Sequence, residues 1–190
     1  TIKYCTITNY QSAGIAVIGK NTTAGAATQN PIPNIFDNSI RGSDSNPSAV
    51  ARSNDGWYTG ILVSYGGRGT IRRNVLSDHY NSAGTNAAGS VIGVGAGIYL
   101  IDVRTITVGS TSTKTDGNVS ANNEYGLMVN VTNGAIPVTS LTIQRNNFVY
   151  NGNVGDDKRQ DVRYVNSGTA ASSSLNMNNN AFVLIFVNFY

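Results

Sequence analysis

The sequence predicts an all-β protein in which short parallel strands coil into a single stack, a β-solenoid of about six rungs that occupies residues 1–190. Three observations predict it. The composition favours strands and turns over helices, a short strand motif carrying an asparagine recurs along the chain, and a second strand motif follows most copies of the first. Each copy is too small to bury an apolar face alone, so successive copies must stack.

The composition supports the first observation. The 190 residues include 25 Asn and 21 Gly but only one Glu and four Lys, while Val and Ile together number 34. β-branched residues favour strands, and Asn and Gly favour tight turns. A charged fraction of 12%, about half the usual quarter, with no apolar run near 18 residues, argues against both a disordered chain and a membrane span. The formal net charge of +3 comes from scattered Arg residues, so no nucleic-acid partner is expected.

Several classes of site are excluded by residue counts. One Cys and one His exclude an internal disulfide framework and a metal site built from several histidines or cysteines, and no cofactor is predicted. A high content of Asn, Ser and Thr is typical of secreted surface proteins, so we expect an extracellular or cell-surface location. The absence of an initiator Met and of a charged-then-apolar leader suggests a mature, trimmed or partial chain.

The first strand motif has an aliphatic residue, two variable residues, Asn, one variable residue and another apolar residue. It begins at Ile2, Ile35, Ile71, Ile143 and Met177, with a degenerate copy at Thr115. The repeated position holds Cys5, Asn38, Asn74, Asn118, Asn146 and Asn180. At a corner of the coil, each asparagine amide can bond to the next one, so we expect an asparagine ladder that ties the rungs together. In that column Cys5 is expected to be a buried, unreactive side chain.

The second strand motif is a short apolar segment, usually opened by glycine. Its copies are Gly14–Val17, Gly60–Val63, Gly97–Leu100, Gly126–Val129 and Asp161–Tyr164. Two interlocked motifs without an intervening helix predict two strands per rung that pair in parallel with the neighbouring rungs.

One segment, from Gly117 to Val129, carries Asn118, Asn122, Asn123, Gly126 and Leu127 at positions that resemble the repeat of right-handed parallel β-helix proteins of the pectin-lyase-like family. The resemblance implies a single-stranded right-handed parallel β-helix. This fold hosts lyases, hydrolases, tailspikes, adhesins and structural proteins, so it does not fix a function. The motifs of the enzymatic branches are missing, and no Asp recurs on successive rungs as a calcium cluster requires, which argues against an enzyme.

Three long insertions, at 41–59, 77–96 and 149–160, leave the predicted coil at one corner. Loops on a rigid scaffold often carry binding groups. Aromatic rings beside polar groups suit sugar rings, so the candidate glycan-binding residues are Asp55, Trp57, Tyr58, Asp78, His79 and Tyr80. The alternative is that Trp57 and Tyr58 only pack a loop onto the sheet and that His79 is a solvated turn residue. Sequons place possible glycosylation at Asn21 and Asn130.

Both ends of the predicted solenoid lack a recognisable cap. The last segment, 182–190, is the most apolar of the chain and is expected to be a strand buried on both faces. Two explanations stay open: a fragment whose flanking rungs are absent, or a subunit that adds end to end into filaments. We favour an extracellular structural or adhesive protein that self-assembles, with a carbohydrate-binding or polysaccharide-cleaving β-helix, or a part of one, as the alternative. The expected self-association residues are Ile2, Tyr4, Ile7, Val183, Leu184, Ile185, Phe186, Val187, Phe189 and Tyr190.

Overall fold

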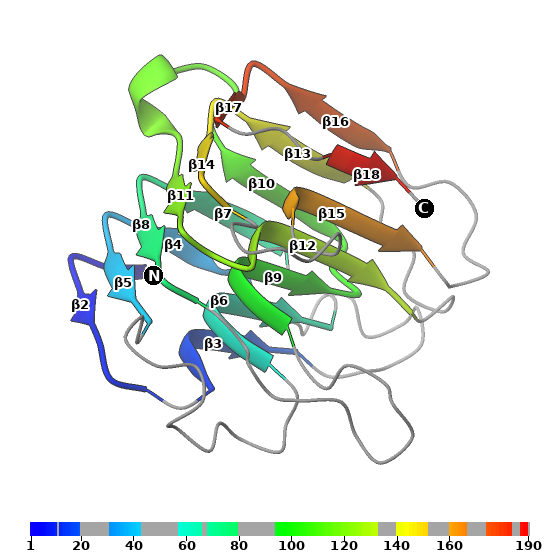
Figure 1. Cartoon of the computed structure of the whole chain (residues 1–190). Helices are drawn as coiled ribbons and strands as arrows, with labels where there is room; N and C mark the ends of the chain where they lie inside the picture. Colours follow the sequence, from blue (N-terminus) through cyan, green and yellow to red (C-terminus); the bar gives the residue numbers. More distant parts are fainter. Residues whose placement is uncertain are drawn as a thin grey trace, which may run out of the picture.

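The computed structural model describes residues 1–10, 12–19, 31–42, 57–65, 68–79, 94–132, 140–151, 160–166, 174–183 and 187–189. These residues form a parallel β-solenoid in which successive strands join three sheets in turn, so that every third strand lies in the same sheet (Figure 1). The predicted all-β fold of stacked parallel strands is confirmed, but each turn has three strands and not two, because the first motif bends at its asparagine and contributes a strand on either side of it. Within the described ranges, no helix is long and apolar enough to cross a lipid bilayer.

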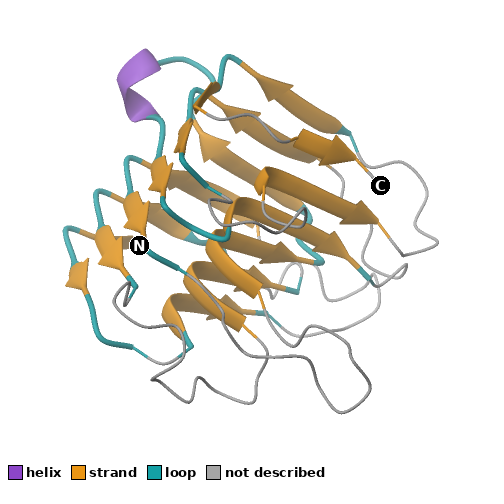
Figure 2. Ribbon diagram, viewed as in Figure 1, coloured by secondary structure: helices purple, strands orange, loops and turns teal. Residues whose placement is uncertain are grey.

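Each of the three sheets has six strands, joined at corners by short turns or by longer connections (Figure 2). Sheet A contains β1 (Ile2–Lys3), β4 (Asn34–Phe36), β7 (Arg68–Arg72), β10 (Thr105–Gly109), β13 (Ser140–Gln144) and β16 (Leu175–Asn178). Sheet B contains β2 (Thr6–Ile7), β5 (Ser39–Arg41), β8 (Val75–Ser77), β11 (Val119–Ala121), β14 (Asn147–Val149) and β17 (Ala181–Val183). Sheet C contains β3 (Ala13–Ile18), β6 (Trp57–Ser64), β9 (Val94–Ile101), β12 (Tyr125–Val131), β15 (Gln160–Asn166) and β18 (Val187–Phe189).

The core lies between the three sheets and is built from columns of aliphatic side chains in register. One sheet A column consists of Ile2, Ile35, Ile71, Val108, Ile143 and Met177. Its four inner members are at most 1% exposed, whereas Ile2 and Met177 on the edge strands are half-buried. Alternation along each strand places one side chain in this core and the next one outside.

Sheet C differs from the other two because its outer face is also apolar and buried. Leu62, Ala96, Tyr99, Tyr125 and Met128 form a second buried cluster on strands β6, β9 and β12. Apolar side chains on both faces explain why these strands read as continuous hydrophobic runs in the sequence.

One strand assignment from the sequence is wrong. The degenerate motif copy beginning at Thr115 does not belong to the sheet A column, because Val108 of β10 pairs with Ile71 of β7. Thr115 instead lies in the 3₁₀ helix η2 (Lys114–Asp116), which interrupts the path from β10 to β11. The extra residues between Val108 and Asn118 separate the first half of the motif from its asparagine.

The predicted strand at 182–190 is divided in the structure. Its first residues belong to β17 in sheet B, and Val187–Phe189 form β18 in sheet C, because the chain turns a corner between the two sheets. The three predicted insertions connect β5 to β6, β8 to β9 and β14 to β15, each time from sheet B to sheet C. Most of their residues lie outside the described part of the chain.

Candidate functional site at the corners and edges

The corner between sheets A and B, here called the A–B corner, holds a continuous hydrogen-bonded column of asparagines. The backbone N–H and the side-chain Nδ2 of each asparagine donate to the Oδ1 of the next, over distances of 2.9 to 3.1 Å. The column runs through Asn38, Asn74, Asn118, Asn146 and Asn180, and its first four members are at most 2% exposed. Nδ2 also donates to a main-chain carbonyl, such as that of Ile71 for Asn118 at 2.8 Å.

The residue before every ladder position except Asn118 turns the corner in a left-handed conformation, whereas Gly117, which precedes Asn118, is extended with φ of −73°. Tyr4, Asp37, Arg73, Arg145 and Asn179 all have a positive φ, between 54° and 59°. This left-handed conformation redirects the chain from sheet A into sheet B within one residue. The asparagine that follows then points inward and satisfies main-chain groups that a tight corner leaves without partners.

The ladder has a direction, and its two ends are chemically different. At the β2 end the position is held by Cys5, whose backbone N–H donates to Asn38 Oδ1 at 3.0 Å and whose half-buried thiol lies 3.4 Å from the Lys3 carbonyl. At the β17 end, Asn180 Oδ1 accepts both donors of Asn146, and Asn180 Nδ2 donates to the Ile143 carbonyl. Asn180 therefore presents its backbone N–H and its Nδ2 towards the sheet edge. If another copy of the chain continued the ladder there, the next side chain would be the Cys5 thiol, which is a poor acceptor for these donors.

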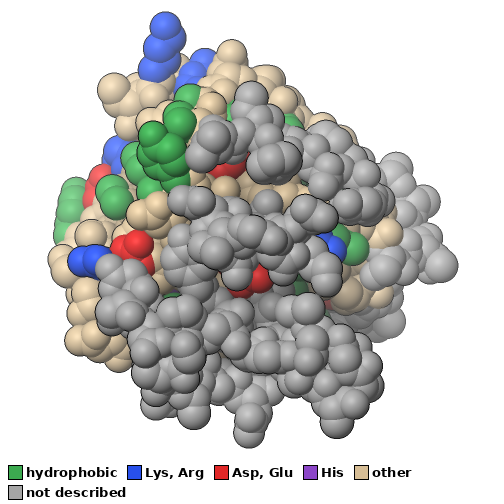
Figure 3. Space-filling view, in the orientation of Figure 1, with side chains coloured by type: hydrophobic (Ala, Val, Ile, Leu, Met, Phe, Trp, Pro, Cys, Tyr) green, Lys and Arg blue, Asp and Glu red, His purple; other side chains and the backbone are tan. Residues whose placement is uncertain are grey.

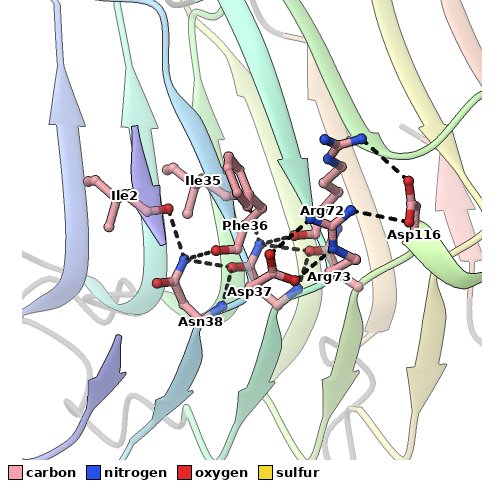
Figure 4. Close-up of polar contacts among 10 residues, drawn as sticks. Ile2, Ile35, Phe36, Asp37, Asn38, Arg72, Arg73 and Asp116 are labelled. Atoms are coloured by element: carbon pink, nitrogen blue, oxygen red, sulfur yellow. Dashed lines mark hydrogen bonds and ion pairs between the residues drawn. The ribbon is translucent and has the colours of Figure 1, made fainter. Parts of the chain in front are cut away.

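Outside the ladder, the A–B corner carries a network of charges (Figure 4). Arg73 holds Asp37 through two bonds of 2.7 and 2.9 Å, and both Arg72 and Arg73 contact Asp116 of η2. Hydrogen bonding from Arg73 lowers the pKa of Asp37, and the carboxylates raise the pKa of Arg73. The Phe36 ring lies among the cations of Lys3, Arg72 and Arg73, at 5.8, 5.6 and 5.5 Å.

A surface pocket of about 420 Å³ opens on the same corner, beside the edge strands β16 and β17. Its lining consists of Lys114, Arg145, Asn147, Asn179, Asn180 and Ala181. The Arg145 guanidinium donates to the Ser110 carbonyl at 2.8 Å. Among the described residues no carboxylate lines the pocket, and those that do line it present positive charge and amides. Figure 3 shows cationic side chains projecting from the surface over η2.

The corner between sheets B and C, here called the B–C corner, holds a second buried polar column. His79 Nδ1 lies 2.6 Å from Asn123 Oδ1, and Asn123 Nδ2 donates to Asn151 Oδ1 at 3.0 Å. Because an amide oxygen only accepts, Nδ1 carries the hydrogen, and Nε2 of a neutral ring accepts from the Tyr10 hydroxyl. Asn151 Nδ2 donates to Asp161 Oδ1 at 2.9 Å. Tyr10 also stacks on Tyr58.

Asp161 ends this column in an unusual state. Asp161 is fully buried, and its Oδ2 has no hydrogen-bond partner among the described residues. Burial raises the pKa of Asp161 to about 6. Glycines precede it at the equivalent position of sheet C, and an added Cβ at Gly97 would lie 2.4 Å from Ser120 Oγ. Asp161 is therefore a side chain inserted where the neighbouring strands have none.

Three of the six candidate glycan-binding residues have described side chains, and all three are buried. Tyr58 is 1% exposed and His79 is fully buried, and both belong to the aromatic group of the B–C corner. Asp78 is mostly buried and accepts bonds from Arg41 and Ser77. Trp57 begins β6, but its side chain, like Asp55 and Tyr80, lies outside the described part. Glycan binding at these residues stays a prediction.

The candidate self-association residues that are described lie on edge strands, except Tyr4, which lies between β1 and β2. Ile2 and Ile7 are half-buried, Tyr4 is 72% exposed and Val183 is 42% exposed. Val187 and Phe189 belong to β18, whose side chains are not described, and the remaining residues, Leu184, Ile185, Phe186 and Tyr190, lie outside the described ranges.

Of the two possible glycosylation sites, the structure describes Asn130. Asn21 lies outside the described residues. Asn130 is half-buried on β12, its Nδ2 lies 3.4 Å from the Tyr99 hydroxyl, and Thr132 of its sequon donates to Asp102. Within the described ranges, no group of three His, Cys, Asp or Glu residues could hold a metal ion.

Sequence reasoning missed the polar column of the B–C corner. A signal existed, because His79, Asn123 and Asn151 are spaced by 44 and 28 residues, the same spacings that separate Asn74, Asn118 and Asn146. It also missed the pocket, because Lys114 belongs to η2 in the connection between β10 and β11, and the repeat does not predict where that connection lies.

Comparison with protein-family models, curated proteins and solved structures gives no match to this chain. The resemblance to pectin-lyase-like proteins is therefore supported by the parallel β-solenoid architecture and by no family relationship.

Proposed function

We propose that this protein is an extracellular structural or adhesive β-solenoid, a right-handed parallel β-helix of six turns, whose copies associate end to end into a fibre or a surface assembly. The six strands in each sheet support the number of turns. The strong preference of parallel strand connections for one hand supports a right-handed coil. The Asn-rich composition with one Glu supports an extracellular location.

The observation that carries the proposal is the contrast between inner and edge members of the core columns. Ile35 and Ile71 are fully buried, whereas Ile2 and Met177 in the same column are half-buried. In sheet B, Phe148 is 1% exposed, but Ile7 and Phe182 at the two edges are half-buried. Apolar side chains at a strand edge favour the addition of another strand, which covers them and pairs the edge backbone groups.

Stacking in register continues every column from one copy to the next. Ile2 and Ile7 of one copy then cover Met177 and Phe182 of the preceding copy, and Cys5 follows Asn180 in the ladder. Because the contact joins two different surfaces and does not close on itself, it produces a filament. The Cys5 thiol is the weak element of this junction, since the backbone N–H and Nδ2 of Asn180 require an oxygen acceptor.

The test compares substitutions at the edge of β2 by electron microscopy and sedimentation velocity. Ile7→Lys places a charge in the junction core and is expected to abolish assembly, whereas Thr6→Lys on the exposed face of the same strand leaves it intact. Cys5→Asn supplies the missing amide and is expected to lower the concentration needed for assembly several-fold. A chain that stays monomeric up to millimolar concentration, or equal assembly by the two lysine variants, contradicts the proposal.

A further inference from the structure

The A–B corner has an exposed aromatic side chain at one edge of the solenoid and a pocket at the other. Tyr4, 72% exposed, occupies the corner position on the side of β1 and β2. The pocket lined by Lys114, Arg145 and Asn179 opens beside the opposite edge strands, β16 and β17. Figure 1 shows β2 and β17 at opposite ends of sheet B. The exposed Tyr4 ring and the pocket therefore lie at the two ends of one column of corner residues.

The conformation of the corner residues shows how this column continues. Tyr4 and Asn179 share the left-handed conformation, with φ of 59° and 55°. Within the chain, the Tyr4 N–H donates to the carbonyl of Asp37, the next corner residue, at 3.1 Å. A second copy that continues the stack would place its Tyr4 one strand spacing, about 4.8 Å, beyond Asn179 and about 10 Å beyond the backbone of Arg145. A tyrosine side chain and an arginine side chain together span that distance.

The corner already packs an aromatic ring among cations. Phe36 lies within 6 Å of the cations of Lys3, Arg72 and Arg73, and Lys3 lies 5.1 Å from the centre of the Tyr4 ring. Asp37 and Asp116 neutralise Arg72 and Arg73. Among the described residues, Lys114 and Arg145 have no carboxylate partner, so their charge is open to the face of an aromatic ring.

We propose that Tyr4 of one copy inserts into the Lys114–Arg145–Asn179 pocket of the preceding copy and determines the register and the direction of the end-to-end contact. This inference rests on the proposed function and names the residues that make the contact specific. The ring is buried against two cations and three asparagines, and its hydroxyl reaches amide partners in the pocket rim. The apolar columns drive association, and the tyrosine selects one arrangement.

The test uses a pair of matched variants of the full chain. Tyr4→Asn removes the ring but keeps a residue that accepts the left-handed corner, as Asn179 does. Tyr150→Asn is the control, because Tyr150 is also exposed, at 48%, and left-handed, with φ of 52°, but lies at the B–C corner. We expect Tyr4→Asn to raise the concentration needed for assembly at least about tenfold, and Tyr4→Phe and Tyr150→Asn to change it less than about threefold.

A cross-linking experiment tests the geometry directly. In a Cys5→Ser background, chains with Tyr4→Cys are mixed with chains carrying Asn179→Cys, and disulfide-linked dimers are expected in the mixture but not in either chain alone. Assembly by Tyr4→Asn that equals Tyr150→Asn, or cross-links that form in one chain alone, overturns the inference while leaving end-to-end association intact. A wild-type chain that never assembles removes the proposed function as well.

Discussion

The A–B corner and the B–C corner both carry a buried polar side chain on several neighbouring strands, but they differ in chemistry. The A–B ladder consists of amides that repeat one geometry, and each inner asparagine bonds to both neighbours and to a main-chain carbonyl. The B–C column passes from a phenol through an imidazole and two amides to a carboxyl group. The asparagine ladder is uncharged at every pH, whereas the B–C column contains groups that can change charge inside the protein.

The difference shows that a buried column of polar side chains has two possible roles in this fold. Where every donor and acceptor is matched, the column fixes the register of the strands. Asp161 ends its column with a carboxyl oxygen that has no partner among the described residues, and such a column costs stability whenever that group is ionised. Three changes test this comparison.

The largest effect is expected in the middle of the ladder. Asn118→Ala removes two bonds donated by Nδ2 and two accepted by Oδ1 in a position that is 2% exposed. We expect a loss of about 4 kcal/mol in the free energy of unfolding, because several buried groups lose their partners. Asn180→Ala at the edge should cost about 1 kcal/mol, since water reaches the groups it leaves.

Urea denaturation of the two variants measures this contrast, and Asn147→Ala, on the exposed face of β14, is the control for loss of an asparagine. Equal losses for Asn118→Ala and Asn180→Ala would mean that the ladder contributes no more inside the solenoid than at its edge.

The second effect depends on pH and belongs to the B–C corner. The pKa of Asp161 is about 6 in the folded protein and near 3.8 in the unfolded chain. The folded state therefore holds the proton more tightly, and its stability is greatest below about pH 4 and falls as the pH rises through 6. The accumulated loss is about 3 kcal/mol. Asp161→Asn removes the charge and keeps an oxygen for Asn151, so it should be about 3 kcal/mol more stable than the wild type at pH 7.5 and nearly equal to it at pH 4.

The free energy of unfolding of both proteins, measured from pH 4 to 8, checks this expectation. Asp161→Ala removes the charge and also the acceptor of Asn151. The difference between Asp161→Ala and Asp161→Asn therefore measures the contribution of this hydrogen bond and of packing, apart from the charge. An Asp161→Asn protein that is less stable than the wild type at pH 7.5 would show that the ionised carboxyl group is stabilised by contacts beyond the Asn151 bond.

The two corners also differ in how far the sequence revealed them. The ladder positions could be read directly, because one residue type recurs beside an aliphatic pattern. The B–C column could not be read this way, because Tyr10, His79 and Asn123 are chemically unlike and share only their spacing. Burial of Tyr58 and His79 was also hidden, since both lie next to long polar segments that suggest exposed loops. The register of β10 was missed because residues 110–116 separate Val108 from Asn118.

The smallest effect is expected on the solvent side of the A–B corner. Asp37 is held by Arg73 through two bonds, and this contact lowers its pKa. The pair therefore stabilises the protein above the ordinary carboxyl pKa of 3.8, and the contribution is lost as the pH falls below it. Asp37→Asn keeps the size and the left-handed conformation of the residue. It should lower the melting temperature slightly at pH 7 and low salt, less at high salt, and progressively less as the pH falls below 3.8. A loss that does not shrink as the pH falls below 3.8 would mean that packing of residue 37, and not its charge, distinguishes the outer side of this corner from the uncharged ladder behind it.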